Sequence, residues 1–149
     1  MLAKLVICTC VFVLGAEGKE TPKPTPKPSK EKKAPAKLQL IAIEKSILAA
    51  TNEERERFGL PPFEVDGELM KSARAHCTWM TENQSMQHTQ LPVAENIAMG
   101  QQDTEDVLNS WMRSPGHRAN ILNGAFRRIG VAAYQTPHGV IFWCQQFRH

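Results

Sequence analysis

The residues of this sequence that could do chemistry are two histidines, His88 and His117, and the acidic Glu95 between them in the chain. Two neutral imidazoles can hold zinc or a similar cation, and a carboxylate can either join them as a ligand or fix one ring's tautomer. Ser114, His117 and Glu95 could also form a serine triad, but the sequence has no Gly-x-Ser-x-Gly turn at that serine. Spacing alone does not bring these residues together, and on spacing alone a structural role is expected for both histidines.

The stretch from Trp111 to Leu122 must position His117. An apolar helix face that includes Trp111 runs into Ser114-Pro115-Gly116, where proline lacks an amide hydrogen and glycine permits a sharp turn. We therefore interpret Ser114 as the residue at which the helix stops. His117 is expected just after this break, at the end of a rigid element, and residues 119–122 are expected to return to the core.

The spacing of apolar residues predicts three helices. They are residues 38–58, a segment that follows the capping residue Asp66, and a segment from Asp103 or Thr104 to Arg113. His76 lies beside a regular apolar stripe on the second helix, so it is expected to be packed or half-exposed rather than a ligand. His88 falls in the loop of residues 81–93.

Two strands are predicted at the end of the chain, residues 129–135 and 140–147, joined as a hairpin. The run Ile141-Phe142-Trp143-Cys144 is apolar on both faces of its strand, which indicates that both faces are covered. The pattern therefore predicts an α+β fold. Its architecture is an α-β-α sandwich, in which helices cover both faces of a small, mainly antiparallel sheet.

Two short stretches together resemble a known family. Ala94-Glu95-Asn96-Ile97-Ala98 and Ser114-Pro115-Gly116-His117-Arg118-Ala119-Asn120-Ile121-Leu122 are similar to motifs of the cysteine-rich secretory, antigen five and pathogenesis-related superfamily, the CAP or SCP domain. The second stretch resembles the bacterial branch. The resemblance covers residues 38–149 and implies the same α-β-α sandwich.

The resemblance also implies a cleft that collects two histidines and two acidic residues. Its first histidine begins a His-Ser/Thr step, which here is His88, and its second follows a glycine, which here is His117. The first acid belongs to a Gly-Glu-Asn motif and matches Glu95, although Ala94 replaces the glycine. The position of the second acid is Ser114. The implied cleft is therefore His88, Glu95, Ser114 and His117.

The function expected from this cleft is that of a secreted binding module. We expect His88 and His117 to hold zinc or another divalent cation, with Glu95 as a ligand or an orienting group, and we expect no organic cofactor. The extracellular ligand could be a lipid, a glycan or a protein. An alternative is a structural or interaction domain displayed at the cell surface, and a metal- or His/Glu-dependent hydrolase ranks last.

The first 37 residues have a different composition from the rest of the chain. Residues 1–18 are typical of a secretory signal peptide, with Lys4, an apolar run and a small-residue cleavage site. Residues 19–37 alternate proline and lysine and are expected to form a disordered tether. The protein is therefore expected outside the cell or in the periplasm or cell envelope.

The positive charge of the chain belongs to this tether. The 149 residues carry a net charge of +3; residues 19–37 hold seven lysines and two glutamates, residues 1–18 are neutral overall, and residues 38–149 are left with −2. The tether could therefore touch anionic surfaces, although a solvated spacer is the simpler expectation. The folded domain is expected to be a monomer that does not bind nucleic acid.

Cys77 and Cys144 are the two cysteines left after removal of the signal peptide. An even number of cysteines in an exported domain predicts a disulfide between them. Two buried, inert thiols are the alternative. A reactive Cys-His pair ranks third, because nothing in the sequence makes the surroundings of Cys77 electropositive.

Overall fold

The computed structural model describes residues 39–149. The predicted signal peptide and tether lie outside the described residues. Four helices and four strands make up this part, and none of its helices is long and apolar enough to cross a membrane. The helices are α1 (Ala42–Arg57), α2 (Gly67–Asn83), α3 (Thr104–Arg113) and α4 (Pro115–Ile121); the strands are β1 (Glu64–Val65), β2 (Ala94–Met99), β3 (Arg128–Gln135) and β4 (Ile141–Arg148).

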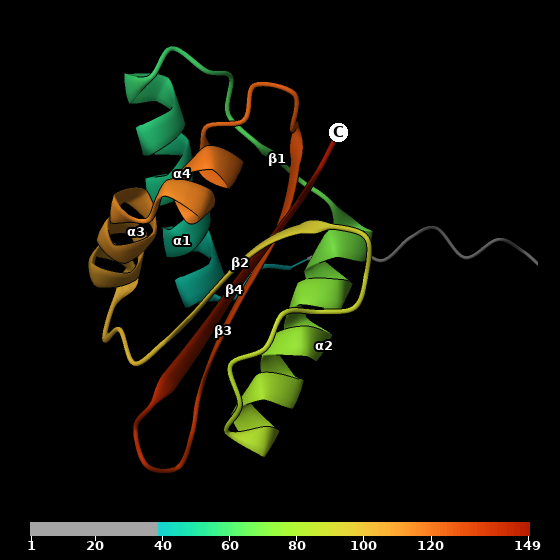
Figure 1. The fold of residues 1–149 in the computed structure, drawn as a ribbon, viewed down its shortest axis with the longest axis vertical. Coiled ribbons are helices and arrows are strands. Elements are labelled where there is room, and N and C mark those ends of the chain that lie inside the picture. The colour runs from blue at the N-terminus through green and yellow to red at the C-terminus, as the bar shows by residue number, and fades with distance from the viewer. Residues whose placement is uncertain (1–38) are drawn as a thin grey trace, which may run out of the picture. The chain divides into compact units, whose positions relative to one another are not determined.

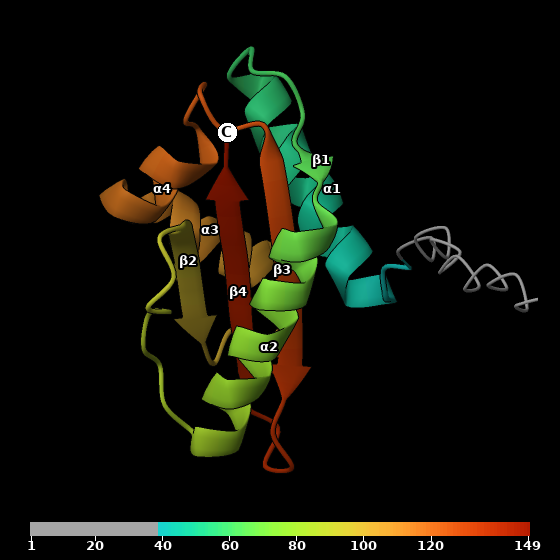
Figure 2. The ribbon, with the colours of Figure 1, turned by 90° about the vertical axis from the view of Figure 1, so that its right-hand side faces the viewer.

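The strands form one mixed sheet in the order β1-β3-β4-β2. Strands β3 and β4 form the predicted antiparallel hairpin, with Ala132 opposite Cys144, and β2 adds to β4 in antiparallel fashion. Strand β1 pairs with β3 in parallel. Helix α2 covers one face of the sheet, and α1, α3 and α4 lie on the other (Figures 1 and 2). The predicted α-β-α sandwich is confirmed.

Each face of the sheet has its own apolar core. On the α2 face, Cys77 and Met80 pack against Phe142 and neighbouring sheet residues. On the opposite face, Trp111 of α3 packs among residues of α1, α4 and the sheet, is 1% exposed, and donates its Nε1–H to the carbonyl oxygen of Ile97 at 3.3 Å. Trp111 is therefore a core residue that also ties α3 to β2.

Helix α2 begins where the sequence predicts and lies unusually close to the sheet. The Asp66 carboxylate accepts the backbone N–H groups of Glu68 and Leu69, both at 2.9 Å, and so caps the helix. A Cβ atom at Gly130 of β3 would lie 2.2 Å from the carbonyl carbon of Leu69. Glycine at this position therefore permits the backbones of α2 and β3 to meet.

The break before His117 is shorter than the sequence predicts. Helix α3 ends at Arg113, Ser114 is extended (φ −91°, ψ 118°), and α4 starts at once with Pro115 in its first turn. Proline is well tolerated there because the first N–H groups of a helix have no partner within it. His117 therefore lies just after the break, as expected, but within a short helix and not at the end of a rigid element.

The predicted disulfide is contradicted by the structure, in which Cys77 and Cys144 are free, buried thiols. Each thiol has another partner: Cys77 donates to the carbonyl oxygen of Phe142 at 3.1 Å, and Cys144 approaches Oε2 of Glu95 at 3.8 Å. Burial raises the pKa of Cys77 to about 12 and also raises that of Cys144. Both thiols are thus protonated and inert near neutral pH.

Candidate functional site

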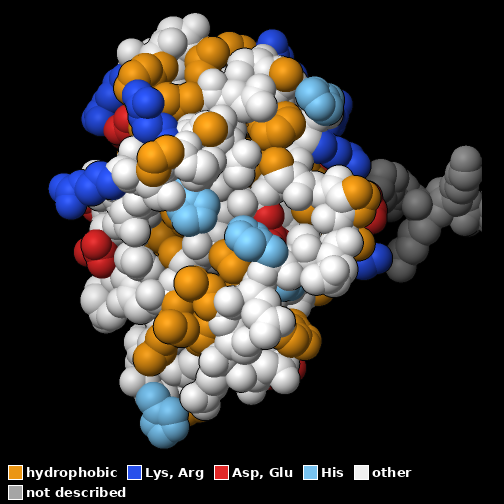
Figure 3. Space-filling model, in the orientation of Figure 1, with side chains coloured by type: hydrophobic (Ala, Val, Ile, Leu, Met, Phe, Trp, Pro, Cys, Tyr) orange, Lys and Arg blue, Asp and Glu red, His pale blue; other side chains and the backbone are white. Residues whose placement is uncertain are grey.

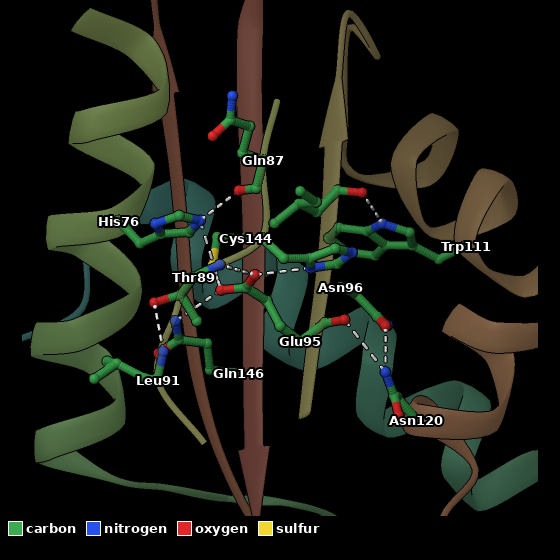
Figure 4. Close-up of polar contacts among 12 residues, drawn as sticks. His76, Gln87, Thr89, Leu91, Glu95, Asn96, Trp111, Asn120, Cys144 and Gln146 are labelled. Atoms are coloured by element: carbon green, nitrogen blue, oxygen red, sulfur yellow. Dashed lines mark hydrogen bonds and ion pairs between the residues drawn. The ribbon is translucent and has the colours of Figure 1, made fainter. Parts of the chain in front are cut away.

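Strand β2 places Glu95 and Asn96 on opposite faces of the sheet, because successive side chains of a strand alternate. Glu95 points toward α2 and the loop that precedes β2, and Asn96 points toward α4 (Figure 4). Both residues are buried, and β2 lies at an edge of the sheet. Buried polar side chains such as these two need hydrogen-bond partners within the protein.

The Glu95 carboxylate has a partner at each oxygen. Its Oε1 accepts the backbone N–H of Thr89 and is 2.9 Å from Nδ1 of His88. Its Oε2 accepts the Nε2–H of Gln146 at 2.8 Å. With only 3% of the Glu95 side chain exposed, these contacts fix the carboxylate between the loop and the sheet.

His88 is held at one ring nitrogen and open at the other. Because the carboxylate accepts hydrogen bonds, Nδ1 of a neutral His88 carries the hydrogen, and Nε2 keeps its lone pair. The His88 side chain is 61% exposed. The arrangement is that of an imidazole oriented by a carboxylate with its free nitrogen available to a ligand.

Asparagines connect His117 to the same strand. The side chain of Asn96 donates to the backbone oxygen of His117 at 3.1 Å, and Asn120 donates to Oδ1 of Asn96 at 3.0 Å. Burial, and then the charge of nearby His88, lower the pKa of His117 below its usual range. His117 is therefore neutral at pH 7, and its ring is within electrostatic reach of His88. Figure 3 shows histidine side chains next to each other, beside an acidic side chain, in the middle of one face.

Comparison with known proteins identifies the family. Residues 48–147 match the Cysteine-rich secretory protein family (CAP). The chain belongs to the CAP family.

Two bacterial relatives support this assignment. The chain is 37% identical over 130 residues to the uncharacterized protein YkwD of Bacillus subtilis (strain 168), an alignment that covers 75% of this chain and 49% of YkwD. It is 30% identical to an extracellular SCP-domain protein from Bacillus anthracis str. Ames, with a TM-score of 0.62 over 70% of this chain and 39% of that one. The chain thus spans about half or less of these relatives' length.

A more distant CAP structure shares the fold alone. The crystal structure of NaASP2 with Zn²⁺ is 14% identical to this chain, with a TM-score of 0.59, and the alignment covers 70% of this chain and 78% of NaASP2. The zinc ion is a property of that crystal. In residues 39–149 of the present CAP domain, no group of three or more His, Cys, Asp or Glu residues is arranged to hold a metal.

Ser114 stands apart from the other predicted site residues. It is half-buried in the junction between α3 and α4, and its side chain makes no capping hydrogen bond. Within the described part of the chain, no hydrogen bond joins it to Glu95 or either histidine. Of the four predicted cleft residues, His88 and Glu95 are therefore in direct side-chain contact, and His117 is connected to β2 through its backbone oxygen.

His76 lies beside Glu95, which the sequence did not reveal. Its Nε2 donates to the backbone oxygen of Gln87 at 2.8 Å and lies 3.7 Å from Oε2 of Glu95 (Figure 4). The side chain is 12% exposed, as expected for a packed position on α2. His76 lies near Glu95 because of the way the loop before β2 crosses α2. The periodicity of α2 does not predict the path of that loop.

Proposed function

We propose that this protein is an extracellular CAP binding module that holds a divalent metal, zinc, at the free ring nitrogens of His88 and His117. The observation that carries the proposal is the contact between Glu95 and Nδ1 of His88 at 2.9 Å. In the neutral ring this contact leaves Nε2 of His88 without a hydrogen, and the fixed Glu95 carboxylate sets the orientation of the ring. The lowered pKa of His117 supports a second neutral imidazole at pH 7.

Glu95 acts in this site as the orienting group and not as a ligand, because both of its oxygens have partners in the protein. Two imidazoles are fewer than the three protein ligands of common catalytic zinc sites. Ser114 supplies no carboxylate as a replacement. The metal is therefore bound weakly and exchangeably, with water completing its coordination, and bound zinc would supply a Lewis-acidic position for an extracellular ligand.

A zinc titration of the metal-free protein by calorimetry tests this proposal. At about pH 7.5 the wild-type protein should bind one zinc ion, and His88→Ala and His117→Ala should each weaken binding at least about tenfold. Affinity should fall at about pH 5.5, because protons compete with zinc for the imidazole nitrogens. His138→Ala, which removes an exposed histidine of the β3–β4 turn, is the matched control and should bind like wild type.

A structural or interaction domain is the second candidate. It is favoured by the complete engagement of Glu95 and by the lack of a three-residue metal cluster in residues 39–149. If His88→Ala and His117→Ala bind zinc as well as wild type does, the metal site is refuted. Loss of thermal stability in His88→Ala without any loss of zinc affinity would then favour the structural role.

A further inference from the structure

A groove runs along α2 beside the candidate metal site. One hollow of about 470 Å³ lies between α2 and the loop before β2. A second hollow of about 270 Å³ continues from it and reaches His88. Both are lined by His76, Trp79 and Thr89, so together they form one channel, which we call the α2 groove.

An aromatic platform forms one wall of the α2 groove. The rings of His76 and Trp79 are stacked, with centroids 6.0 Å apart and planes 6° from parallel. His76 is held by the backbone oxygen of Gln87, so the pair is fixed before any ligand arrives. Trp79 is nevertheless 41% exposed, and Leu91 on the opposite wall is 52% exposed. A rigid, solvent-facing indole of this kind is typical of binding surfaces.

The groove also offers hydrogen-bonding groups within a mostly apolar surface. Five of the eight residues that line the larger hollow are polar or charged. Ser72 is one of them, and its Oγ is buried without a hydrogen-bond partner in the described part of the chain. Because this oxygen is itself buried, the exposed polar residues of this hollow are Lys71 and Glu68. Lys71 and Glu68 add one charge of each sign, which leaves this part of the groove neutral.

We infer that the α2 groove binds a neutral oligosaccharide chain. A pyranose ring presents one face of C–H groups, which can pack on the indole of Trp79, and a rim of hydroxyls, which can both donate and accept hydrogen bonds. That combination matches a platform surrounded by Thr89, Lys71 and Glu68. The two connected hollows favour a chain of sugars over a single unit.

Other ligand classes fit the α2 groove less well. An acyl chain would desolvate the charged side chains of Lys71 and Glu68, which is costly. A nucleic acid requires a positive surface, and the single Lys71 is offset by Glu68. The groove is therefore chemically suited to a ligand without charge.

Titration of the full-length protein with two neutral sugars tests this inference. The probes are cellotetraose, which has hydroxyls only, and chitotetraose, which carries acetamido groups, so the pair distinguishes two sources of the same chemistry. Trp111 and Trp143 are buried in the core, so a change in tryptophan fluorescence would report on Trp79. At least one sugar should bind with a Kd of about 1 mM or tighter, confirmed by calorimetry.

Variants then locate the sugar. Trp79→Ala should weaken binding at least about tenfold. Phe58→Ala removes another exposed aromatic, 49% exposed and outside the groove, and should bind like wild type. Failure of both sugars to bind at millimolar concentration, or wild-type affinity in Trp79→Ala, would overturn the inference, as would binding of anionic vesicles in place of sugars.

The zinc and sugar proposals can fail separately. Trp79→Ala should retain wild-type zinc affinity, because within residues 39–149 no hydrogen bond joins the Trp79 side chain to Glu95, His88 or His117. His117→Ala should lose zinc but still bind sugar, because His117 lines neither hollow of the α2 groove. Loss of sugar binding in His88→Ala together with wild-type binding in Trp79→Ala would place the sugar in the metal cleft and refute the α2 groove.

Discussion

Arg55 is the residue on which much of the α1 side of the fold depends. It is fully buried, and none of the ion pairs within residues 39–149 includes it. Its guanidinium instead donates to four backbone oxygens, those of Pro61, Ile121, Asn123 and Phe126, at 2.7–3.3 Å, and lies 3.8 Å from the ring centre of Phe63. Burial, and then the charge of Arg127, lower the pKa of Arg55. One side chain thus connects α1 with the loop that follows it, with the end of α4 and with the residues after α4.

Replacement of Arg55 by methionine should lower the free energy of unfolding by about 3 kcal/mol or more. Methionine fills similar space but leaves four carbonyl oxygens without their donor. Urea unfolding followed by circular dichroism measures the loss. Arg57→Met is the control, since Arg57 is 68% exposed and pairs only with Glu54 of its own helix. Equal stability of the two variants would show that the carbonyl contacts of Arg55 contribute little.

The candidate site was predicted only in part from individual residues of the sequence. The family motifs indicated His88 and Glu95 as neighbours, and the structure places them in hydrogen-bond contact. His76 was missed because helical spacing reports only which face of α2 is buried, not what lies across it. The predicted disulfide was wrong because an even number of cysteines does not show whether two thiols face each other. Cys77 instead contacts the carbonyl oxygen of Phe142, and Cys144 contacts the carboxylate of Glu95.

At the scale of elements, the sequence predicts the long helices and the hairpin but not β2. Amphipathic spacing and the cap at Asp66 are local signals, and they determine α2 well. Strand β2 carries Glu95 and Asn96 as consecutive buried polar residues, which breaks the alternation typical of strands. The carbonyl oxygens of Glu95 and Ile97 bond to the side chains of Asn120 and Trp111, so distant residues cover this edge.

The contact of α2 with β3 gives a prediction about an element pair. Gly130→Ala should lower the free energy of unfolding by about 1–3 kcal/mol, because its Cβ would lie 2.2 Å from the Leu69 carbonyl carbon and would push the helix from the sheet. Thermal unfolding measures the change. Gly67→Ala, at the start of the same helix, is the control because its added Cβ would meet nothing within 4 Å beyond its chain neighbours and its own helix backbone. A Gly130→Ala variant as stable as Gly67→Ala would show that α2 can move without cost.

At the scale of the whole molecule, the sandwich is predictable because each layer has its own periodicity. The apolar stripes of the helices and the two apolar faces of β4 indicate which surfaces must be covered. The resemblance to the family indicates how the layers are arranged. The structure adds how the far ends are joined: Asp66 caps α2 and also pairs with Arg148 at the end of β4. The start of the α2 layer and the last strand therefore share one carboxylate.

Acid should destabilise this fold in two steps. His117 has a lowered pKa, caused by burial and then by His88, so the unfolded chain takes up its proton first and stability falls as the pH drops below about 6.5. Burial alone would raise the pKa of Asp66, but the N–H of Leu69 and the Arg148 guanidinium outweigh it and lower that pKa. Its contribution is present above about pH 3.9 and is lost as the pH falls through the lower folded value.

Urea unfolding of the metal-free protein at a series of pH values separates the two steps. His117→Gln should flatten the loss of stability just below about pH 6.5, because glutamine has no proton to gain there. Asp66→Asn keeps a capping oxygen at α2 but should remove the loss below about pH 3.9 and lower stability at pH 7 through the missing charge pair with Arg148. His117→Gln could instead steepen the loss of folding stability below about pH 6.5. That result would mean that the folded state favours the protonated form of His117. It would refute a ring that is neutral in the folded protein and free to bind zinc at pH 7.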